Sequence, residues 1–174
     1  MANYSNQFCN GCPYQNQNHL VGTNHFIQNG QPLSIERKIN ADILLVFQSP
    51  GENEWINNSP LYSHSPHSAR ARIENSWLRT GHTRQEYDIT NAVQCYPGKG
   101  RSRDLKPRVI PICMCRSWLN IDITAKPYTR IITFGNIAYQ SVNTILQSIP
   151  LHIQVTQSVH PTGGVTNAFL DSLW

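Results

Sequence analysis

The stretch Ala41-Asp-Ile-Leu-Leu-Val-Phe-Gln-Ser-Pro-Gly51 decides the fold that the sequence predicts. Its apolar run is short, as in a buried strand, and we expect that strand over 41–48. Ser49-Pro50-Gly51 is typical of a turn that ends a strand. The stretch therefore predicts a buried strand that leads directly into a loop.

Further strands and helices alternate along the rest of the chain. The pattern predicts an irregular segment over 1–40, a long loop over 49–66, strands over 87–90, 130–134 and 153–155 (the last reaching toward 159), and helices over 67–79, 109–119, 136–146 and 165–174. Such alternation favours a parallel sheet covered on both faces. We expect an α/β fold, a three-layer sandwich with a central four-stranded, mainly parallel sheet, in one domain over 1–174.

Size and composition place the chain among ordinary globular proteins. It has 174 residues, of which 39% are hydrophobic, and a net charge of +4. No apolar run approaches the roughly 18–20 residues of a membrane span, and the first residues lack a signal-peptide pattern. We expect an intracellular, cytoplasmic protein without a membrane partner, and a monomer in the absence of any interface signal.

Four cysteines have the spacing of a metal or cluster site. Cys9 and Cys12 form a Cys-x-x-Cys pair, and Cys95 and Cys115 lie far downstream. Reduced intracellular thiols in such a pattern more often bind metal than form disulfides. Four thiolates hold either an iron–sulfur cluster or structural zinc. The fifth, Cys113, is either a small buried side chain or a competing ligand.

Polar residues follow the predicted strands. Parallel α/β sheets bind small molecules and nucleotides outside the carboxyl ends of their strands. The segments at these ends are 48–54, Asn91, Gly135-Asn136 and His160-Pro161. The sequence therefore predicts a site at one edge of the sheet.

A basic loop follows the second predicted strand. Within ten residues it carries five cations and a single acid, Asp104; the cations are Lys99, Arg101, Arg103, Lys106 and Arg108. Such a loop is able to neutralise phosphates, although a solvated basic loop has the same composition.

Five segments, taken in order, resemble the uracil-DNA glycosylase superfamily, in particular its iron–sulfur-containing (family 4-like) branch. They are Cys9-Asn-Gly-Cys12-Pro, the 41–51 stretch, Ile89-Thr-Asn-Ala-Val-Gln-Cys95-Tyr-Pro, Cys115-Arg-Ser-Trp-Leu and Val159-His-Pro161. No single segment is specific, but their order and spacing together are. The resemblance implies excision of uracil or a related base from DNA.

The resemblance also implies roles for individual residues. His160 would donate a hydrogen bond to the leaving base; the alternative is a surface histidine in a loop. Glu54 would activate or position a water molecule; the alternative is a solvated loop carboxylate. Asn91 would read the base, since an amide both donates and accepts, although Asn is also common in turns. The loop Ser49, Pro50 and Gly51 would approach the base. The resemblance also implies Cys115, and not Cys113, as the fourth ligand. The cofactor would be a [4Fe–4S] cluster, with structural zinc as the alternative, and it would hold the N-terminal segment against the basic loop. Lys99, Arg101 and Arg103 of that loop would contact the DNA backbone.

Two segments depart from the pattern of the branch. Phe47 and Gln48 stand where the branch has glycine and an acid, and an amide is able to hold a water but cannot take its proton. Leu61 stands at the position of an aromatic residue that stacks on the base, with Tyr62 beside it. Stacking on an aromatic ring contributes about 1–3 kcal/mol per base, so Tyr62 would have to compensate.

Three interpretations follow. The first is a DNA glycosylase, with Gln48 among its catalytic residues. The second is a non-catalytic binder of modified or single-stranded DNA on the same scaffold, favoured by Gln48, Leu61 and the basic loop. The third is a metal-stapled α/β domain with an unrelated nucleotide ligand.

Overall fold

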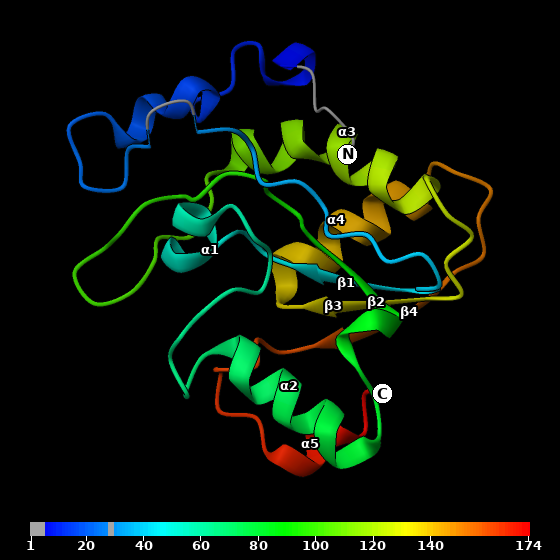
Figure 1. Ribbon diagram of the computed structural model, residues 1–174. Helices are drawn as coiled ribbons and strands as arrows, with labels where there is room; N and C mark the ends of the chain where they lie inside the picture. Colours follow the sequence, from blue (N-terminus) through cyan, green and yellow to red (C-terminus); the bar gives the residue numbers. More distant parts are fainter. Residues whose placement is uncertain (1–5, 28–29) are drawn as a thin grey trace.

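A four-stranded parallel sheet forms the centre of the computed structural model, which describes residues 6–27 and 30–174 (Figure 1). The strands lie in the order β2-β1-β3-β4. Their bounds are β1 Ile43–Phe47, β2 Tyr87–Asn91, β3 Arg130–Phe134 and β4 Gln154–Ser158. All three pairings are parallel, so the four carboxyl ends share one edge.

Two pairs of helices cover the two faces of the sheet (Figure 1). The helices are α2 Ala69–Thr80 with α5 Asn167–Asp171, and α3 Val109–Thr124 with α4 Asn136–Leu146. Alternate side chains of β1 point to opposite faces. Leu45 packs in the cluster that contains Trp77 of α2, whereas Leu44 packs with Leu119 of α3. The three-layer α/β sandwich predicted from the sequence is therefore confirmed, with a sheet that is parallel throughout.

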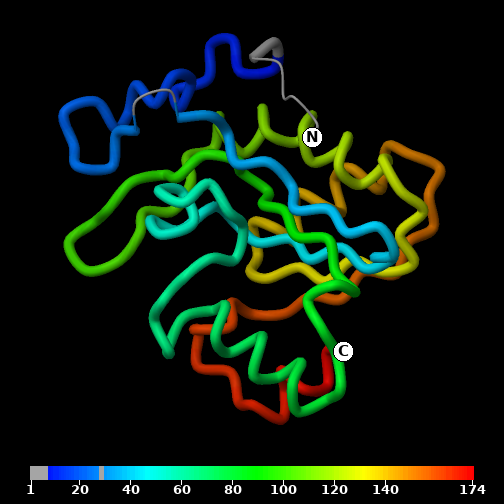
Figure 2. Tube along the Cα trace, viewed as in Figure 1, coloured from blue at the N-terminus to red at the C-terminus, as the bar shows by residue number. Residues whose placement is uncertain are grey.

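The short 3-10 helix η1 Asn6–Cys9 lies over α3 (Figure 2). A second, η2 Gln15–Leu20, follows it, and neither was predicted for a segment that the sequence analysis expected to be irregular. The ring of Phe8 meets that of Trp118 edge to face, with centroids 4.9 Å apart. This contact brings the first cysteine pair to the middle of α3.

The predicted loop over 49–66 contains a helix, α1 Glu52–Asn57, and here the sequence-based prediction is wrong. The helix begins after Gly51, whose N–H donates to the carboxylate of Glu54. Asn58 ends it in a left-handed conformation, with φ 47°. Gly51 has no side chain, so only the Glu54 half of a capping box is present. This bond and the αL cap at Asn58 stabilise a short helix within a segment rich in Asn, Ser and Pro.

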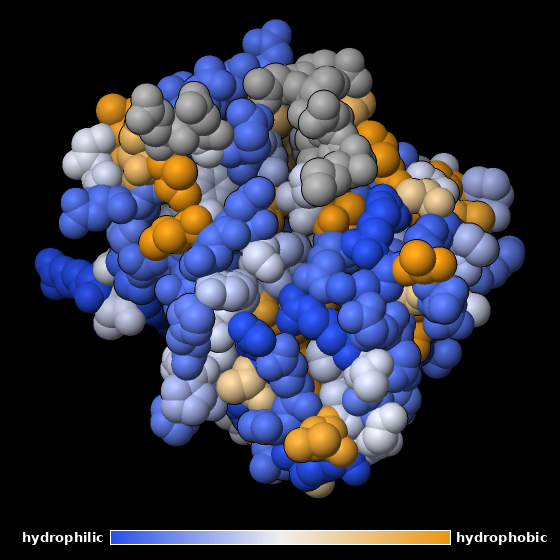
Figure 3. Space-filling view, in the orientation of Figure 1, coloured by the Kyte–Doolittle hydropathy of each residue, from blue (hydrophilic) through white to orange (hydrophobic). Residues whose placement is uncertain are grey.

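Other boundaries differ at helix ends. The strand over 130–134 and the helix over 136–146 match their predictions. The helix predicted over 109–119 continues to Thr124, and the last helix, predicted over 165–174, spans only Asn167–Asp171. Among the described residues, no helix combines the length and the apolar character needed to cross a membrane. The face seen in Figure 3 is mostly hydrophilic, with separate hydrophobic patches.

Replacing Trp77 by Ala should lower the free energy of unfolding by about 3–5 kcal/mol, because it removes a large buried ring. Trp77 is 2% exposed and stacks on Tyr87, with centroids 4.8 Å apart. The neighbouring Leu78 is 80% exposed, so Leu78→Ala should change stability by less than about 0.5 kcal/mol. Urea unfolding of both variants tests this, and equal effects would contradict the layer arrangement.

Candidate functional site

A cavity of about 550 Å³ lies at the carboxyl edge of the sheet. Most of the residues that the sequence analysis singled out as catalytic, base-binding or phosphate-binding line it: Gln48, Ser49, Pro50, Gly51, Glu54, Leu61, Tyr62, Lys99, Arg103 and His160. The volume falls in the range of small-molecule sites, roughly 300–1,000 Å³. The structure thus brings together residues that are more than one hundred positions apart.

The carboxylate of Glu54 joins two walls of this cavity. Its Oε2 accepts from the N–H of Gly51 at 2.6 Å, and its Oε1 accepts from the N–H of Leu61 at 2.5 Å. Burial raises the pKa of Glu54 to about 7; the two N–H donors act against this rise and the Asp104 carboxylate adds to it. Sequence analysis gave Glu54 the role of activating or positioning water. In the structure its carboxylate binds the backbone N–H groups of Gly51 and Leu61.

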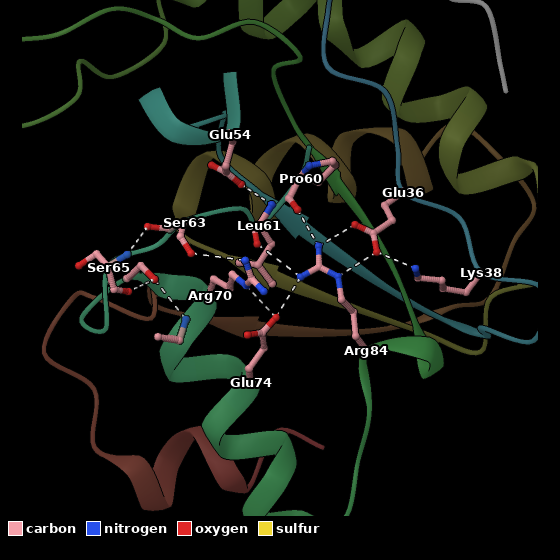
Figure 4. A network of polar contacts seen from close by, with 12 residues as sticks. Glu36, Lys38, Glu54, Pro60, Leu61, Ser63, Ser65, Arg70, Glu74 and Arg84 are labelled. Atoms are coloured by element: carbon pink, nitrogen blue, oxygen red, sulfur yellow. Dashed lines mark hydrogen bonds and ion pairs between the residues drawn. The ribbon is translucent and has the colours of Figure 1, made fainter. Parts of the chain in front are cut away.

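Leu61 is fixed from its other side by Arg84 (Figure 4). The guanidinium of Arg84 donates to the carbonyl of Pro60 at 2.7 Å and contacts that of Leu61 at 3.4 Å, and it pairs with Glu36 at 2.6 Å. Leu61 has a left-handed backbone, with φ 50°. Its side chain packs into the core with Phe47, so it lies in the wall of the cavity as a buried aliphatic group.

Tyr62 lies beside Leu61 and also lines the cavity. Its hydroxyl lies 2.8 Å from Nε2 of His64, and the guanidinium of Arg70 lies 5.6 Å from the centre of its ring. Tyr62 therefore supplies an aromatic ring to the cavity, in contact with the exposed His64 and the partly buried Arg70.

An aromatic pair forms the inner wall of the cavity. Phe47 and Phe134, at the ends of β1 and β3, stack with centroids 4.6 Å apart and planes 13° apart. The ring of His160 lies 6.4 Å from that of Phe47. Sequence analysis noted Phe47 only as a departure and missed Phe134, although the position of Phe134 at a strand end was the available signal.

His160 has a defined hydrogen-bonding state. Its Nδ1 lies 2.8 Å from Oγ1 of Thr162 and 3.3 Å from the N–H of Thr162, which only donates. Nδ1 is therefore an acceptor, and the neutral ring carries its proton on Nε2. The ring edge meets solvent, but the surrounding protein desolvates it enough to lower its pKa below the usual value. Arg72 donates to the carbonyls of Pro161 and Val165 and so holds the loop that carries His160.

Asn91 does not line the cavity. It pairs with Phe47 across the β1–β2 ladder and is 1% exposed. Its Oδ1 has no hydrogen-bond partner among the described residues, while its backbone carbonyl accepts from the side chain of Gln94. This residue, predicted to read the base, is therefore buried at the end of β2 and is not among those that line the cavity.

The basic loop folds as a hairpin over one side of the cavity. Lys99 and Asp104 form an antiparallel bridge, and Nζ of Lys99 contacts Glu52 at 2.9 Å and Asp104 at 3.3 Å. Arg103 lines the cavity, whereas Arg101 is exposed beyond it. Asp104 also lines the cavity, and sequence analysis gave it no role.

The four predicted ligand cysteines surround a second, small cavity of about 30 Å³. Cys9, Cys12, Cys95 and Cys115 are each 6–8% exposed, whereas Cys113 is exposed to solvent. Within residues 6–27 and 30–174, no three His, Cys, Asp or Glu side chains are grouped closely enough to hold one metal ion.

N–H groups point at two of these sulfur atoms. The backbone N–H of Tyr14 donates to Sγ of Cys12 at 3.4 Å, and the backbone N–H of Gln94 bonds to Cys115. Trp118 packs in the same cluster as Cys9. Burial raises the pKa of the Cys115 thiol to about 12, although the N–H of Gln94 acts against the rise. Burial likewise raises the pKa of the Cys9 and Cys95 thiols, so ionising these three requires a compensating positive charge.

Comparison with known proteins gives the family. The chain matches no curated protein. The family model described as the Uracil DNA glycosylase superfamily matches residues 35–174, which include all four strands and every residue that lines the larger cavity. This chain therefore belongs to the uracil DNA glycosylase superfamily.

Proposed function

We propose that this protein is a DNA glycosylase that removes uracil or a related modified base from DNA by hydrolysis of the N-glycosidic bond. The observation that carries the proposal is His160 at the larger cavity, with its Nε2–H available as a donor. Breaking the glycosidic bond leaves negative charge on the departing base, and a fixed donor aimed at that charge accelerates the reaction.

The rest of the cavity suits a base taken out of the stack. Enzymes that act on a base in DNA bind single strands or flip the nucleotide into a pocket. The cavity has the volume for one nucleotide, and the Phe47–Phe134 pair offers it an apolar wall. Lys99 and Arg103 at the rim, with Arg101 beyond it, supply positive charge for the phosphates.

Glu54 has a positioning role in this proposal. Its two oxygens accept from Gly51 and Leu61, so it sets the distance between the loop after β1 and the loop that carries Tyr62. A non-catalytic binder on the same scaffold is the second candidate. It is favoured by Gln48, which cannot take a proton, and by Leu61, whose aliphatic side chain is packed into the core.

We also propose that Cys9, Cys12, Cys95 and Cys115 hold a [4Fe–4S] cluster. The residues fit such a group: four buried thiols surround one cavity, and backbone N–H groups are directed at two of the sulfurs. Such hydrogen bonds favour thiolates and tune iron–sulfur centres. When bound, the cluster would cross-link the N-terminal segment, the loop after β2 and α3 through its four cysteine ligands. Zinc, with Zn–S distances of about 2.3 Å, would hold the four sulfurs closer together than a cluster does.

Excision is tested with a labelled single-stranded oligonucleotide that contains one deoxyuridine, followed by alkali and a denaturing gel. We expect cleavage at the uracil by the native protein. His160→Ala should lower the single-turnover rate about 10²–10³-fold, the cost of losing one donor to a developing anion. His152→Ala, at an exposed loop position before β4, is the matched control and should leave the rate unchanged. Tight binding to the modified strand without cleavage would favour the binder.

The cluster is tested by absorption and metal analysis of anaerobically purified protein. We expect a brown protein with about four iron and four sulfide per chain. Cys115→Ser should lose the colour and lower stability because it leaves an incomplete ligand set, whereas Cys113→Ser should keep both because Cys113 faces solvent. A colourless protein with one zinc would contradict the cluster, and loss of metal in Cys113→Ser alone would contradict the ligand set.

A further inference from the structure

Three carboxylates line the larger cavity, and they differ in what occupies their oxygens. They belong to Glu52, Glu54 and Asp104. Glu54 is bound to two backbone N–H groups. Glu52 contacts Lys99 at 2.9 Å and Nδ1 of His25 at 3.2 Å, so each of its oxygens has a cationic or polar partner. Glu52 and Glu54 therefore have no carboxylate oxygen that is free to bind a ligand in the cavity.

Asp104 does present such an oxygen. Its Oδ1 accepts from the hydroxyl of Tyr96 at 2.8 Å and lies 3.3 Å from Nζ of Lys99. Its Oδ2 accepts no hydrogen bond from any described residue, and the side chain is 37% exposed. A carboxylate with one oxygen anchored and the other open is suited to bind a water molecule.

The open oxygen faces the loop after β1. A methyl group placed on Gly51 would lie 3.4 Å from Oδ2 of Asp104 and 3.3 Å from Oε2 of Glu54. Because position 51 has no side chain, the space in front of Oδ2 remains clear. The carboxylate thus lies against the loop in which Gln48 replaces the acid that the family resemblance implied.

Asp104 is held in place by a buried donor and by the hairpin that carries it. Tyr96 is completely buried and directly follows Cys95, so its hydroxyl is a rigid donor. The hairpin closes by backbone bonds from the N–H of Gly100 to the carbonyl of Arg103 at 2.8 Å and from the N–H of Leu105 to the carbonyl of Gly98 at 2.9 Å. Preorganised groups of this kind contribute most to catalysis because they need no rearrangement during the reaction.

We propose that Asp104 is the carboxylate that takes the proton from the attacking water, in place of an acid at Gln48. This inference rests on the proposed glycosylase function. The water oxygen forms a bond to C1′ of the deoxyribose while the bond from C1′ to the base nitrogen breaks. The electron pair of that bond leaves with the base, whose carbonyl oxygen accepts from Nε2–H of His160. Oδ2 of Asp104 takes the proton of the water and later returns it to solvent, which also protonates the released base.

Asp104→Asn is the direct test, since the amide oxygen keeps the contacts to Tyr96 and Lys99 but cannot accept the proton. We expect the single-turnover rate on the deoxyuridine oligonucleotide to fall about 10²–10⁴-fold, the usual contribution of a general base. Affinity for an oligonucleotide with a non-excisable 2′-fluoro-deoxyuridine should stay within about threefold. Asp42→Asn is the control: Asp42 lies before β1, at the opposite edge of the sheet, where it contacts Thr129, and the rate should not change.

Tyr96→Phe gives a second readout that a purely structural role would not move. The groups that face Asp104 are Tyr96, Lys99 and Glu54, with Glu52 reached through Lys99. The Tyr96 hydroxyl anchors Oδ1 of Asp104, so Tyr96→Phe should loosen the carboxylate and lower the single-turnover rate about tenfold, with unchanged affinity for the 2′-fluoro-deoxyuridine strand. In the Asp104→Asn background the same substitution should cause no further loss, because the group that the hydroxyl positions no longer accepts a proton.

The outcomes separate the inference from the function on which it rests. If Asp104→Asn keeps the rate within a few-fold while His160→Ala loses excision, Asp104 is not the base and the glycosylase stands. If Gln48→Ala shows the loss expected of Asp104→Asn, the water is held at Gln48 instead. If the native protein releases no base from any modified oligonucleotide that it binds, both proposals fail together.

Discussion

The larger cavity depends on one carboxylate that two backbone N–H groups share. Glu54 accepts from Gly51, at the start of α1, and from Leu61, in the loop beyond it. Arg84 holds the same loop from outside through the carbonyls of Pro60 and Leu61. The peptide group between Pro60 and Leu61 is bonded at both its N–H and its C=O, so it cannot move without leaving a buried partner unsatisfied, which costs about 1–3 kcal/mol for each bond. This constraint keeps Leu61 in a left-handed conformation and Tyr62 at the cavity.

The two cavities are connected through consecutive residues of the chain. Cys95 faces the small cavity, and Tyr96 directly after it reaches Asp104 in the larger one. Any group that fixes the four cysteines therefore also fixes the residue that anchors the proposed general base. In this account the cysteine site is structural, yet it acts at the place where the chemistry occurs, because it determines where the hairpin of Lys99 and Asp104 lies.

Much of the fold could be predicted from the sequence, because strands and helices of this chain have clear apolar periodicity. The order of the strands could not, since periodicity does not encode which strands pair. The helix α1 was missed because its stability comes from a capping contact of Glu54 and not from the composition of its segment. Most of the candidate site was predicted from strand ends and family resemblance. The sequence analysis gave Asp104 no role because it lies among five basic residues. It assigned Asn91 to base recognition because sequence does not show how deeply a side chain at the end of a strand is buried.

The most direct test of the account is a crystal structure of the protein with a single-stranded oligonucleotide that carries 2′-fluoro-deoxyuridine. The account predicts that the base occupies the larger cavity against Phe47 and Phe134, with a carbonyl oxygen within hydrogen-bond distance of Nε2 of His160. It also predicts a water between Oδ2 of Asp104 and C1′ of the sugar. A base bound outside this cavity, or His160 and Asp104 both remote from the glycosidic bond, would contradict it.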